Sequence, residues 1–306
     1  MGYNILIVGC GKLGKRYIES IDSHSNEYTI RLILVDPYTN FSEISIKCQY
    51  TSYKDISDID NIDNIDLVIV STCSDVRFDI INKIIQKTKI KNYIIEKIIF
   101  QKVEDYNIFY SLILKHNLNV WINTPRRTYD YYKYLKTIIN KNNFSFEITG
   151  YNWNISSNAI HFIDLFCYFK DILDIKLILQ NAEIIKSKRD KYQDILGTII
   201  NDDESLIIKN LNNVGNNNLI MNKIIKSDNK NIIIENSNGY LNIVENINGL
   251  ITKKKYLVPL ISETAFTFIK NIIDKGNCEL PKYEEVYKIH IEYIKLYDIF
   301  DNINIT

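Results

Sequence analysis

Short apolar runs alternate with amphipathic segments over the first 120 residues of the chain. Apolar residues recur with helical spacing at 76–88 and 103–116, whereas the polar stretch 41–65 predicts a short helix or loop. Five apolar runs have strand length, at residues 3–8, 30–35, 67–71, 93–95 and 119–122. Because strands alternate with helices, we expect an α/β domain over residues 1–123, built on a doubly wound parallel sheet of the Rossmann type.

The pattern changes after about residue 123. Helical spacing at 127–140 and 158–169 flanks a strand-like alternation at 144–153. Residues 176–245 contain several strand-like runs with turn signals between them, and the chain ends in helical patterns at about 263–275 and 283–302. The sequence therefore predicts a second, α+β domain over residues 124–306, with a large, mainly antiparallel open sheet.

A glycine-rich turn directly follows the first strand. The turn consists of Gly9, Cys10, Gly11, Lys12, Leu13 and Gly14. In a strand–turn–helix unit, the first glycine permits the tight turn, the second lets a pyrophosphate approach the backbone, and the third lets helix and strand pack closely. The N-terminus of the following helix attracts phosphate groups. This context predicts a bound dinucleotide, and the alternative is a glycine turn that serves packing alone.

Asp36 ends the second strand, about 20 residues beyond the glycines, which is the usual place for a ribose-binding acid. Its carboxylate can accept hydrogen bonds from the adenosine ribose hydroxyls and would repel a 2′-phosphate. NAD(H) is therefore the expected cofactor. NADP(H) stays an alternative, because a basic residue such as Lys12 could meet the phosphate.

Ligands of open parallel sheets bind beyond the carboxyl ends of the strands. The ends of the later strands carry Ser71, Thr72, Glu96, Lys97 and Asn123. We expect the first four to contact the cofactor and Asn123 to contact the substrate. The parallel arrangement would unite these residues with the glycine turn in one site.

Composition and charge narrow the classes of function. Lys+Arg and Asp+Glu both number 37, and this zero formal net charge argues against a nucleic-acid partner. The five cysteines form no CxxC pair, and no cluster of residues has metal-ligand spacing, so no metal site or disulfide framework is expected. No apolar run approaches the roughly 18 residues of a membrane span, and the early strand leaves no place for a signal peptide. These features predict a cytoplasmic protein without a membrane partner.

Four motifs resemble, in order, those of the glucose–fructose oxidoreductase/inositol dehydrogenase (Gfo/Idh/MocA-like) family. They are GCGKLG, IIEKIIF, NTPRR and NAIHFIDLF, which begin at residues 9, 94, 123 and 158. The second resembles the family's Glu-Lys-Pro motif, and the fourth resembles its Gly-x-His-x-x-Asp helix. The resemblance spans the chain. It implies an NAD(P)-dependent oxidoreductase that acts on a sugar, a sugar phosphate or a nucleotide-linked sugar, in carbohydrate or surface-polysaccharide biosynthesis.

Two residues depart from the family pattern. Ile98 replaces the proline after the lysine, and a cis Lys–Ile bond costs about 3 kcal/mol. Ser157 stands where the family often has an aspartate, four residues before the histidine. Because a serine can hydrogen-bond but carries no charge, His161 is expected to be a weaker base than its counterparts in the family's polyol dehydrogenases.

Lys97 and His161 are the candidates for proton transfer. The Lys97 ammonium would hydrogen-bond the reacting oxygen and relay its proton, and the alternative is a solvated surface lysine. His161 would act as general acid or base, with Asp164 one helical turn later as its structural or orienting partner. The alternative for His161 is a core histidine that a backbone group satisfies.

Other polar residues near these motifs are candidates for substrate binding. Arg126 and Arg127 could clamp a phosphate or carboxylate, although an interdomain salt bridge would account for them equally well. The residues that flank the histidine helix are expected to line the sugar pocket, namely Trp153, Asn154, Ser157 and Asn158.

Two further functions stay open. The family resemblance also covers non-catalytic NAD(P)-binding regulators, and redox-assisted glycoside cleavage would recycle a bound NAD. An open sheet face is often a partner surface, so we expect a homodimer or homotetramer joined through the second-domain sheet.

Overall fold

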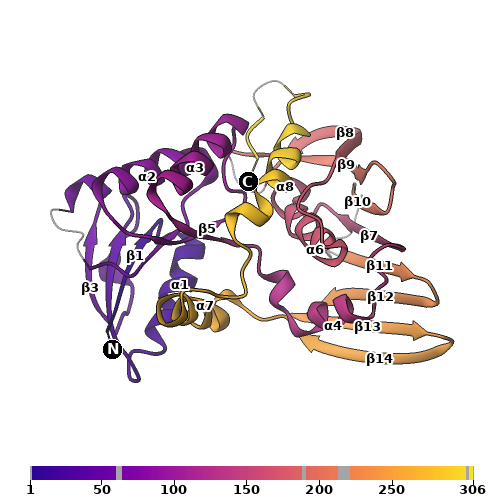
Figure 1. The fold of residues 1–306 in the computed structure, drawn as a ribbon, viewed down its shortest axis with the longest axis horizontal. Coiled ribbons are helices and arrows are strands. Elements are labelled where there is room, and N and C mark those ends of the chain that lie inside the picture. The colour runs from indigo at the N-terminus through magenta and orange to yellow at the C-terminus, as the bar shows by residue number, and fades with distance from the viewer. Residues whose placement is uncertain (1, 60–63, 188–190, 213–220, 301–302, 306) are drawn as a thin grey trace. The chain divides into compact units, whose positions relative to one another are not determined.

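The computed structural model describes residues 2–59, 64–187, 191–212, 221–300 and 303–305. The chain forms two compact units (Figure 1). Residues 1–123 and 259–284 form the first unit, and residues 124–258 and 285–306 form the second. The sequence analysis assigned residues 259–284 to the second domain, whereas in the structure this segment packs with the first unit.

In the described part of the first unit, six parallel strands form one sheet in the order β3-β2-β1-β4-β5-β6. The strands are β1 (Gly2–Val8), β2 (Thr29–Val35), β3 (Gln49–Tyr53), β4 (Leu67–Val70), β5 (Asn92–Glu96) and β6 (Asn119–Asn123). This is the strand order of the doubly wound dinucleotide-binding fold, so the expected α/β class is confirmed. The edge strand β3 lies in the stretch for which the sequence predicted a short helix or loop.

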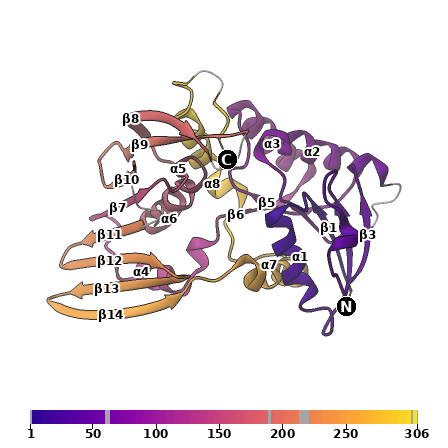
Figure 2. The same cartoon turned by 180° about the vertical axis from the view of Figure 1, so that it is seen from behind.

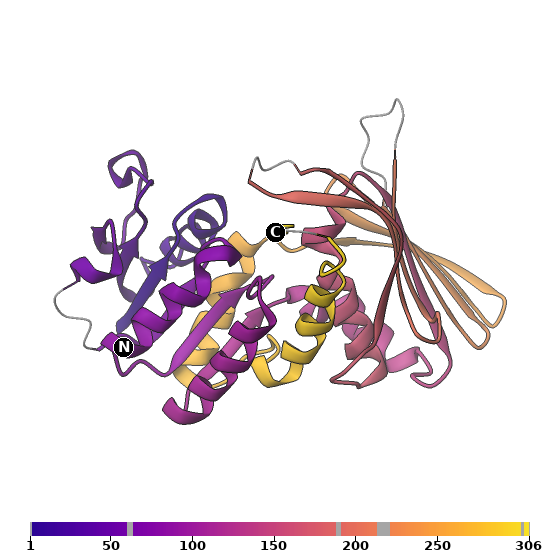
Figure 3. The same ribbon diagram turned by 90° about the horizontal axis from the view of Figure 1, so that it is seen from above.

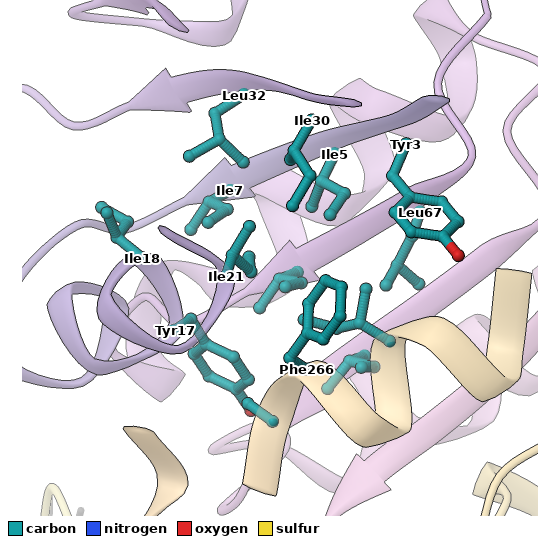
Figure 4. Packing of buried hydrophobic residues seen from close by; sticks show 14 of the residues in the cluster. Tyr3, Ile5, Ile7, Tyr17, Ile18, Ile21, Ile30, Leu32, Leu67 and Phe266 are labelled. Atoms are coloured by element: carbon teal, nitrogen blue, oxygen red, sulfur yellow. The ribbon is translucent and has the colours of Figure 1, made fainter. Parts of the chain in front are cut away.

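Four α-helices accompany this sheet in the described residues, together with two short 3₁₀ turns. They are α1 (Lys12–Asp22), α2 (Ser74–Lys87), α3 (Val103–His116), α7 (Ile261–Lys275), η1 (Phe41–Glu43) and η2 (Ile56–Asp58). Helix α7 lies beside α1, and Phe266 of α7 shares a hydrophobic core with Tyr17 and Ile21 of α1 and Ile7 of β1 (Figure 4). Each large side chain buried in this way contributes roughly 1.5–3 kcal/mol, which explains why α7 belongs to this unit.

The sheet of the second unit has the order β14-β13-β12-β11-β7-β10-β9-β8 in the described residues. Its strands are β7 (Phe144–Tyr151), β8 (Leu177–Lys186), β9 (Gln193–Asn201), β10 (Leu206–Leu211), β11 (Met221–Ser227), β12 (Lys230–Ser237), β13 (Tyr240–Ile247) and β14 (Leu250–Leu257). Strands β11 to β14 form an antiparallel meander (Figure 2). The described pairs are antiparallel except β7 with β10, so the expected mainly antiparallel sheet is confirmed.

The described helices of the second unit lie on one face of this sheet (Figure 3). They are α4 (Asp130–Ile138), α5 (Ile155–Asn158), α6 (Ile160–Lys170) and most of α8 (Tyr283–Lys295), and the 3₁₀ turn η3 (Pro125–Thr128) precedes them. Rings of α6 pack on β7, as Phe166 does on Phe144 and Phe162 on Phe146. We call the opposite side the outer face, and its exposed apolar residues are Ile178, Leu211, Ile233, Ile251 and Leu257.

Candidate functional site

Two glycines of the turn between β1 and α1 are required by the turn itself. Gly9 has a φ of +89°, and a Cβ on it would lie 2.6 Å from the backbone nitrogen of Thr72. A Cβ on Gly14 would lie 2.0 Å from the carbonyl oxygen of Gly9. The first glycine therefore permits the turn, and the third permits close packing of α1 on the end of β1.

The second glycine differs, because the turn alone does not require it. A Cβ on Gly11 would meet no described heavy atom within 4 Å. Helix α1 begins one residue later, and no described side chain caps its N-terminus. Open space in front of uncapped N–H groups suits a phosphate. The turn therefore fits the pyrophosphate of a dinucleotide.

Asp36 joins this turn to the loop that follows β2. One carboxylate oxygen accepts from the backbone N–H of Cys10 at 2.7 Å, and the other accepts from Tyr38 and Thr39 at 2.8 Å each. A carboxylate has about four acceptor positions, so one position remains for a ribose hydroxyl. Asp36 thus holds the turn and keeps the capacity to bind a ribose.

The other turn residues have different surroundings. Cys10 is buried in the core, and burial raises the pKa of its thiol to about 12, so it is a packing residue. Leu13 packs against the same core, and Lys12 is exposed. Lys54, which the sequence analysis did not consider, donates to the carbonyl oxygen of Pro37 in the loop after Asp36 at 3.1 Å. Lys12 and Lys54 thus place basic groups in the turn and at the loop after Asp36.

Ser71 and Thr72 follow β4 and shape the glycine turn from the side. The Ser71 hydroxyl donates to the carbonyl oxygen of Gly9 at 2.6 Å. The backbone of Thr72 lies where a side chain on Gly9 would have to be. Both residues therefore lie beside the glycine turn at the expected site.

Glu96, at the end of β5, is buried. Its Oε1 accepts from the hydroxyl of Tyr17 at 2.7 Å and from the side-chain amide of Asn123. Burial raises the pKa of Glu96, and these two hydrogen bonds act against that rise. Sequence analysis expected Glu96 to contact the cofactor and Asn123 to contact the substrate, but the structure shows the two side chains bonded to each other.

Lys97 is half-buried directly after β5, and the Lys97–Ile98 peptide bond is cis. The bond is therefore cis although Ile98 stands in place of the family's proline. Arg77 of α2, which the sequence analysis overlooked, is buried beside this segment. Its guanidinium donates to the carbonyl oxygens of Thr72, Glu96, Ile98 and Ile99. Arg77 thus fixes the backbone on both sides of Lys97.

In the second unit, Arg127 is bound by two carboxylates. It forms a two-pronged ion pair with the fully buried Asp164, with Nε 3.1 Å from Oδ2, and its Nη1 lies 3.2 Å from Glu285. Burial raises the pKa of Asp164, and the guanidinium charge acts against that rise. Three of the five N–H donors of Arg127 are bound to carboxylates, which favours the salt-bridge alternative over a substrate clamp, with partners that lie in the second unit. The contacts of Asp164 likewise support its structural role.

His161 lies half-buried on α6, four residues after the half-buried Ser157. Trp153 is buried, donates from Nε1 to the carbonyl oxygen of Lys209 at 3.0 Å, and packs on Phe162. Trp153 is therefore a core residue, which corrects its expected place in a sugar pocket. Asn158 donates to the carbonyl oxygen of Trp153 at 2.9 Å, and Asn154 is half-buried with a φ of +56°.

The described residues contain no group of three or more His, Cys, Asp or Glu side chains that could hold a metal ion. Their helices are all too short or too polar to cross a membrane.

Residues 3–124 match the family model described as "Oxidoreductase family, NAD-binding Rossmann fold", the model of GFO_IDH_MocA. The match covers the Rossmann part of the first unit, so residues 3–124 are similar to the NAD-binding domain of the Gfo/Idh/MocA family. This result confirms the family resemblance and the NAD-binding Rossmann fold.

Solved structures extend the similarity of fold to the second unit. UDP-N-acetylglucosamine 3-dehydrogenase GnnA from Acidithiobacillus ferrooxidans superposes with a TM-score of 0.72 at 10% identity, covering 97% of each chain. An oxidoreductase from Agrobacterium radiobacter, solved in complex with NAD+, L-tartaric acid and magnesium, gives 0.71 at 12% identity, covering 97% of this chain and 94% of the other.

Transcriptional regulator Gal80p from Kluyveromyces lactis gives 0.68 at 16% identity, covering 97% of this chain and 91% of the other. No curated protein sequence matches this chain. Since all three identities are low, the likeness is one of fold, and a dehydrogenase, an oxidoreductase and a transcriptional regulator share it.

Proposed function

We propose that the protein is an oxidoreductase that uses NAD(H) to transfer a hydride to or from a sugar, a sugar phosphate or a nucleotide-linked sugar. The observation that carries the proposal is the set of groups at the carboxyl ends of the strands in the first unit. There, the open and uncapped glycine turn follows β1, the carboxylate of Asp36 follows the neighbouring strand β2, and the half-buried Lys97 follows β5 of the same parallel sheet. Ligands of doubly wound sheets bind at this edge.

The chain's own groups account for cofactor binding. The N–H groups at the start of α1 would hold the pyrophosphate, and the remaining acceptor position of Asp36 would hold a ribose hydroxyl. A 2′-phosphate would face the carboxylate, so NAD(H) is proposed over NADP(H). The bound nicotinamide supplies the hydride acceptor or donor.

Lys97 and His161 are proposed to handle the proton of the reacting hydroxyl. The Lys97 ammonium would donate a hydrogen bond to that oxygen and stabilise its negative charge, and Arg77 would keep the lysine's backbone in place. The His161 imidazole would accept the proton during oxidation and return it during reduction. Both roles are proposed from the motifs that contain these residues, IIEKIIF and NAIHFIDLF, which resemble those of the family.

The proposal is tested by a thermal-shift screen of sugar phosphates and nucleotide sugars with NAD present, followed by turnover of the compounds that bind. The expected result is a change in nicotinamide absorbance with at least one sugar derivative. Titration calorimetry should show tighter binding of NADH than of NADPH. Binding of NADH without turnover of any sugar derivative that binds would contradict the enzyme assignment.

A regulator is the second candidate, because the fold is shared with Gal80p and because Ser157 replaces the family's aspartate near His161. A regulator would bind NAD and a sugar derivative without converting either. Redox-assisted glycoside cleavage would instead release a free sugar with no net change in the nicotinamide. Mass spectrometry of the reaction products, together with the absorbance, separates these three outcomes.

A further inference from the structure

Two cations of the second unit lie at the same aromatic ring. The guanidinium carbon of Arg126, in η3, is 4.2 Å from the ring centroid of Phe162 in α6. The ammonium nitrogen of Lys223, in β11, is 5.7 Å from the same centroid. Both distances lie within the range of cation–π attraction, about 6 Å. Two positive groups are thereby gathered in a small part of the sheet's helix-covered side.

No carboxylate of the described residues forms an ion pair with either cation. Lys223 is completely buried, and the contact of its ammonium besides the ring is the side-chain oxygen of Asn236, at 2.5 Å. Burial lowers the pKa of Lys223 well below its usual value, and the charge of Arg126 lowers it further. A buried cation without a counter-ion is costly, and within the described residues this cluster has none of the carboxylates with which such groups ordinarily pair.

Two donors of the same cluster are also unsatisfied. The Nε of Arg126 is buried and has no hydrogen-bond partner among the described residues, and the buried hydroxyl of Tyr132, which interacts with the Arg126 side chain, donates its own proton to none of them. Burial raises the pKa of Tyr132 to about 12, with the guanidinium of Arg126 acting against that rise, so its hydroxyl keeps its proton and can donate. Most buried polar groups in proteins have a partner, and each exception calls for an explanation.

The neighbouring residue Arg127 has a structural role, and its surroundings differ from those of Arg126. Arg127 is bound by Asp164 and Glu285. Arg126, one residue earlier in the same turn, has a ring, a phenol and a second cation around it. Within the described residues, carboxylates therefore neutralise the guanidinium of Arg127, and none pairs with that of Arg126.

We propose that Arg126, Lys223 and Tyr132 form a subsite for an oxyanion of the substrate, a carboxylate or a phosphate. The proposal rests on the proposed function in that the oxyanion belongs to a sugar derivative, and it narrows the substrate to an anionic sugar. A guanidinium matches both oxyanions with paired N–H donors, the phenol adds a further donor, and the ammonium adds charge. Binding would satisfy the open donors and supply the missing counter-ion.

The test compares matched sugars by titration calorimetry on the NAD-loaded protein. Glucuronate, glucose 6-phosphate and glucose serve as carboxylate, phosphate and neutral probes, and inorganic phosphate tests the subsite alone. We expect one anionic sugar to bind at least about tenfold more tightly than glucose, and the stronger of the two identifies the oxyanion. The ratio of the affinity for this anionic sugar to the affinity for glucose should fall to near one in Lys223→Met and in Arg126→Gln.

Lys226→Met is the matched control, because Lys226 lies on the same strand but is exposed on the outer face. It should keep the wild-type preference. Lys223→Met replaces a buried amine with an apolar side chain of similar length, so it should fold even if Arg126→Gln does not, and a thermal melt checks this.

Three results would overturn the subsite: equal binding of the anionic and neutral sugars by the wild type, a preference that survives in Lys223→Met, or no binding of any of the anions. The readout is binding, so it is independent of turnover. A protein that prefers an anionic sugar but transfers no hydride would contradict the proposed function and support the subsite. A protein that oxidises neutral and anionic sugars equally well would support the proposed function and contradict the subsite.

Discussion

The substitution Gly11→Ala tests whether the open space at the glycine turn holds a pyrophosphate. The structure predicts that the protein itself tolerates the change. The added methyl group would meet no described atom within 4 Å, and the backbone of Gly11, with φ −67°, is one that any residue adopts. The methyl group would instead occupy the surface that a phosphate must approach.

The expected magnitudes differ sharply between stability and binding. Alanine restricts the unfolded chain more than glycine does, which stabilises the fold by about 0.4–1 kcal/mol. Alanine is also a poorer N-cap than glycine, and this loss is of similar size. The free energy of unfolding should therefore stay within about 1 kcal/mol of the wild-type value. Affinity for NADH should fall at least about tenfold, or about 1.4 kcal/mol.

Titration calorimetry with NADH measures the affinity, and urea unfolding without cofactor measures the stability. Gly14→Ala is the control, because its methyl group would lie 2.0 Å from the carbonyl oxygen of Gly9. That overlap should cost about 3 kcal/mol or more, so this variant loses binding through loss of the fold. A folded Gly11→Ala protein with wild-type NADH affinity would show that no pyrophosphate lies at this glycine.

Four further predictions concern other parts of the chain. Lys97→Ala and His161→Ala should each lower turnover roughly 10²–10⁴-fold and leave the affinity for NADH nearly unchanged. Lys97→Arg should not restore turnover, since a guanidinium keeps its proton. Full turnover in both alanine variants would refute the roles of the two residues. Arg127→Met should lower the free energy of unfolding by about 3–5 kcal/mol in urea titrations, because it leaves the buried carboxylate of Asp164 without its cation, whereas adding Asp164→Leu should recover part of the loss. Burial raises the pKa of Glu96, so wild-type stability falls as the pH rises from about 4.3, the unfolded value, through the folded pKa. Glu96→Gln should therefore gain stability relative to the wild type over that pH range, and a difference that is constant across urea titrations at several pH values would count against this. The outer face should join two or four copies of the chain, which sedimentation velocity at micromolar concentration would contradict by showing a monomer.

The central strands of the first unit could be predicted from sequence because both faces of their sheet are covered. Strands β1, β2 and β4 are therefore nearly continuous apolar runs, and such runs stand out against a polar chain. The glycine turn and Asp36 could be placed for the same reason, since each directly follows one of these strands. Local sequence contained the whole of that information.

The elements that the sequence analysis overlooked are those whose pattern depends on distant partners. Strand β14 is an exposed edge with three consecutive lysines, and β3 is a polar edge strand, so neither has an apolar run. Buried and more exposed positions alternate along strand β11, but one buried position is Lys223, so the sequence lacks the apolar alternation that predicts a strand. Helix α7 is amphipathic in sequence, and only its packing on α1 shows to which unit it belongs.

The two arginines of the NTPRR motif show where sequence reasoning on the site reaches its limit. Both have the same chemistry and adjacent positions, so local sequence gives them the same expected role. Their difference arises from carboxylates far along the chain: Asp164 lies 37 residues after Arg127, and Glu285 lies 158 residues after it. The helix that carries Asp164 also carries the ring of Phe162, beside which Arg126 meets Lys223 from a strand that the sequence did not reveal. A charge becomes structural when the fold gives it a counter-ion, and it stays available to a ligand when the fold does not. For this chain, that distinction separates the arginine that holds the second unit together from the one that we propose binds the substrate.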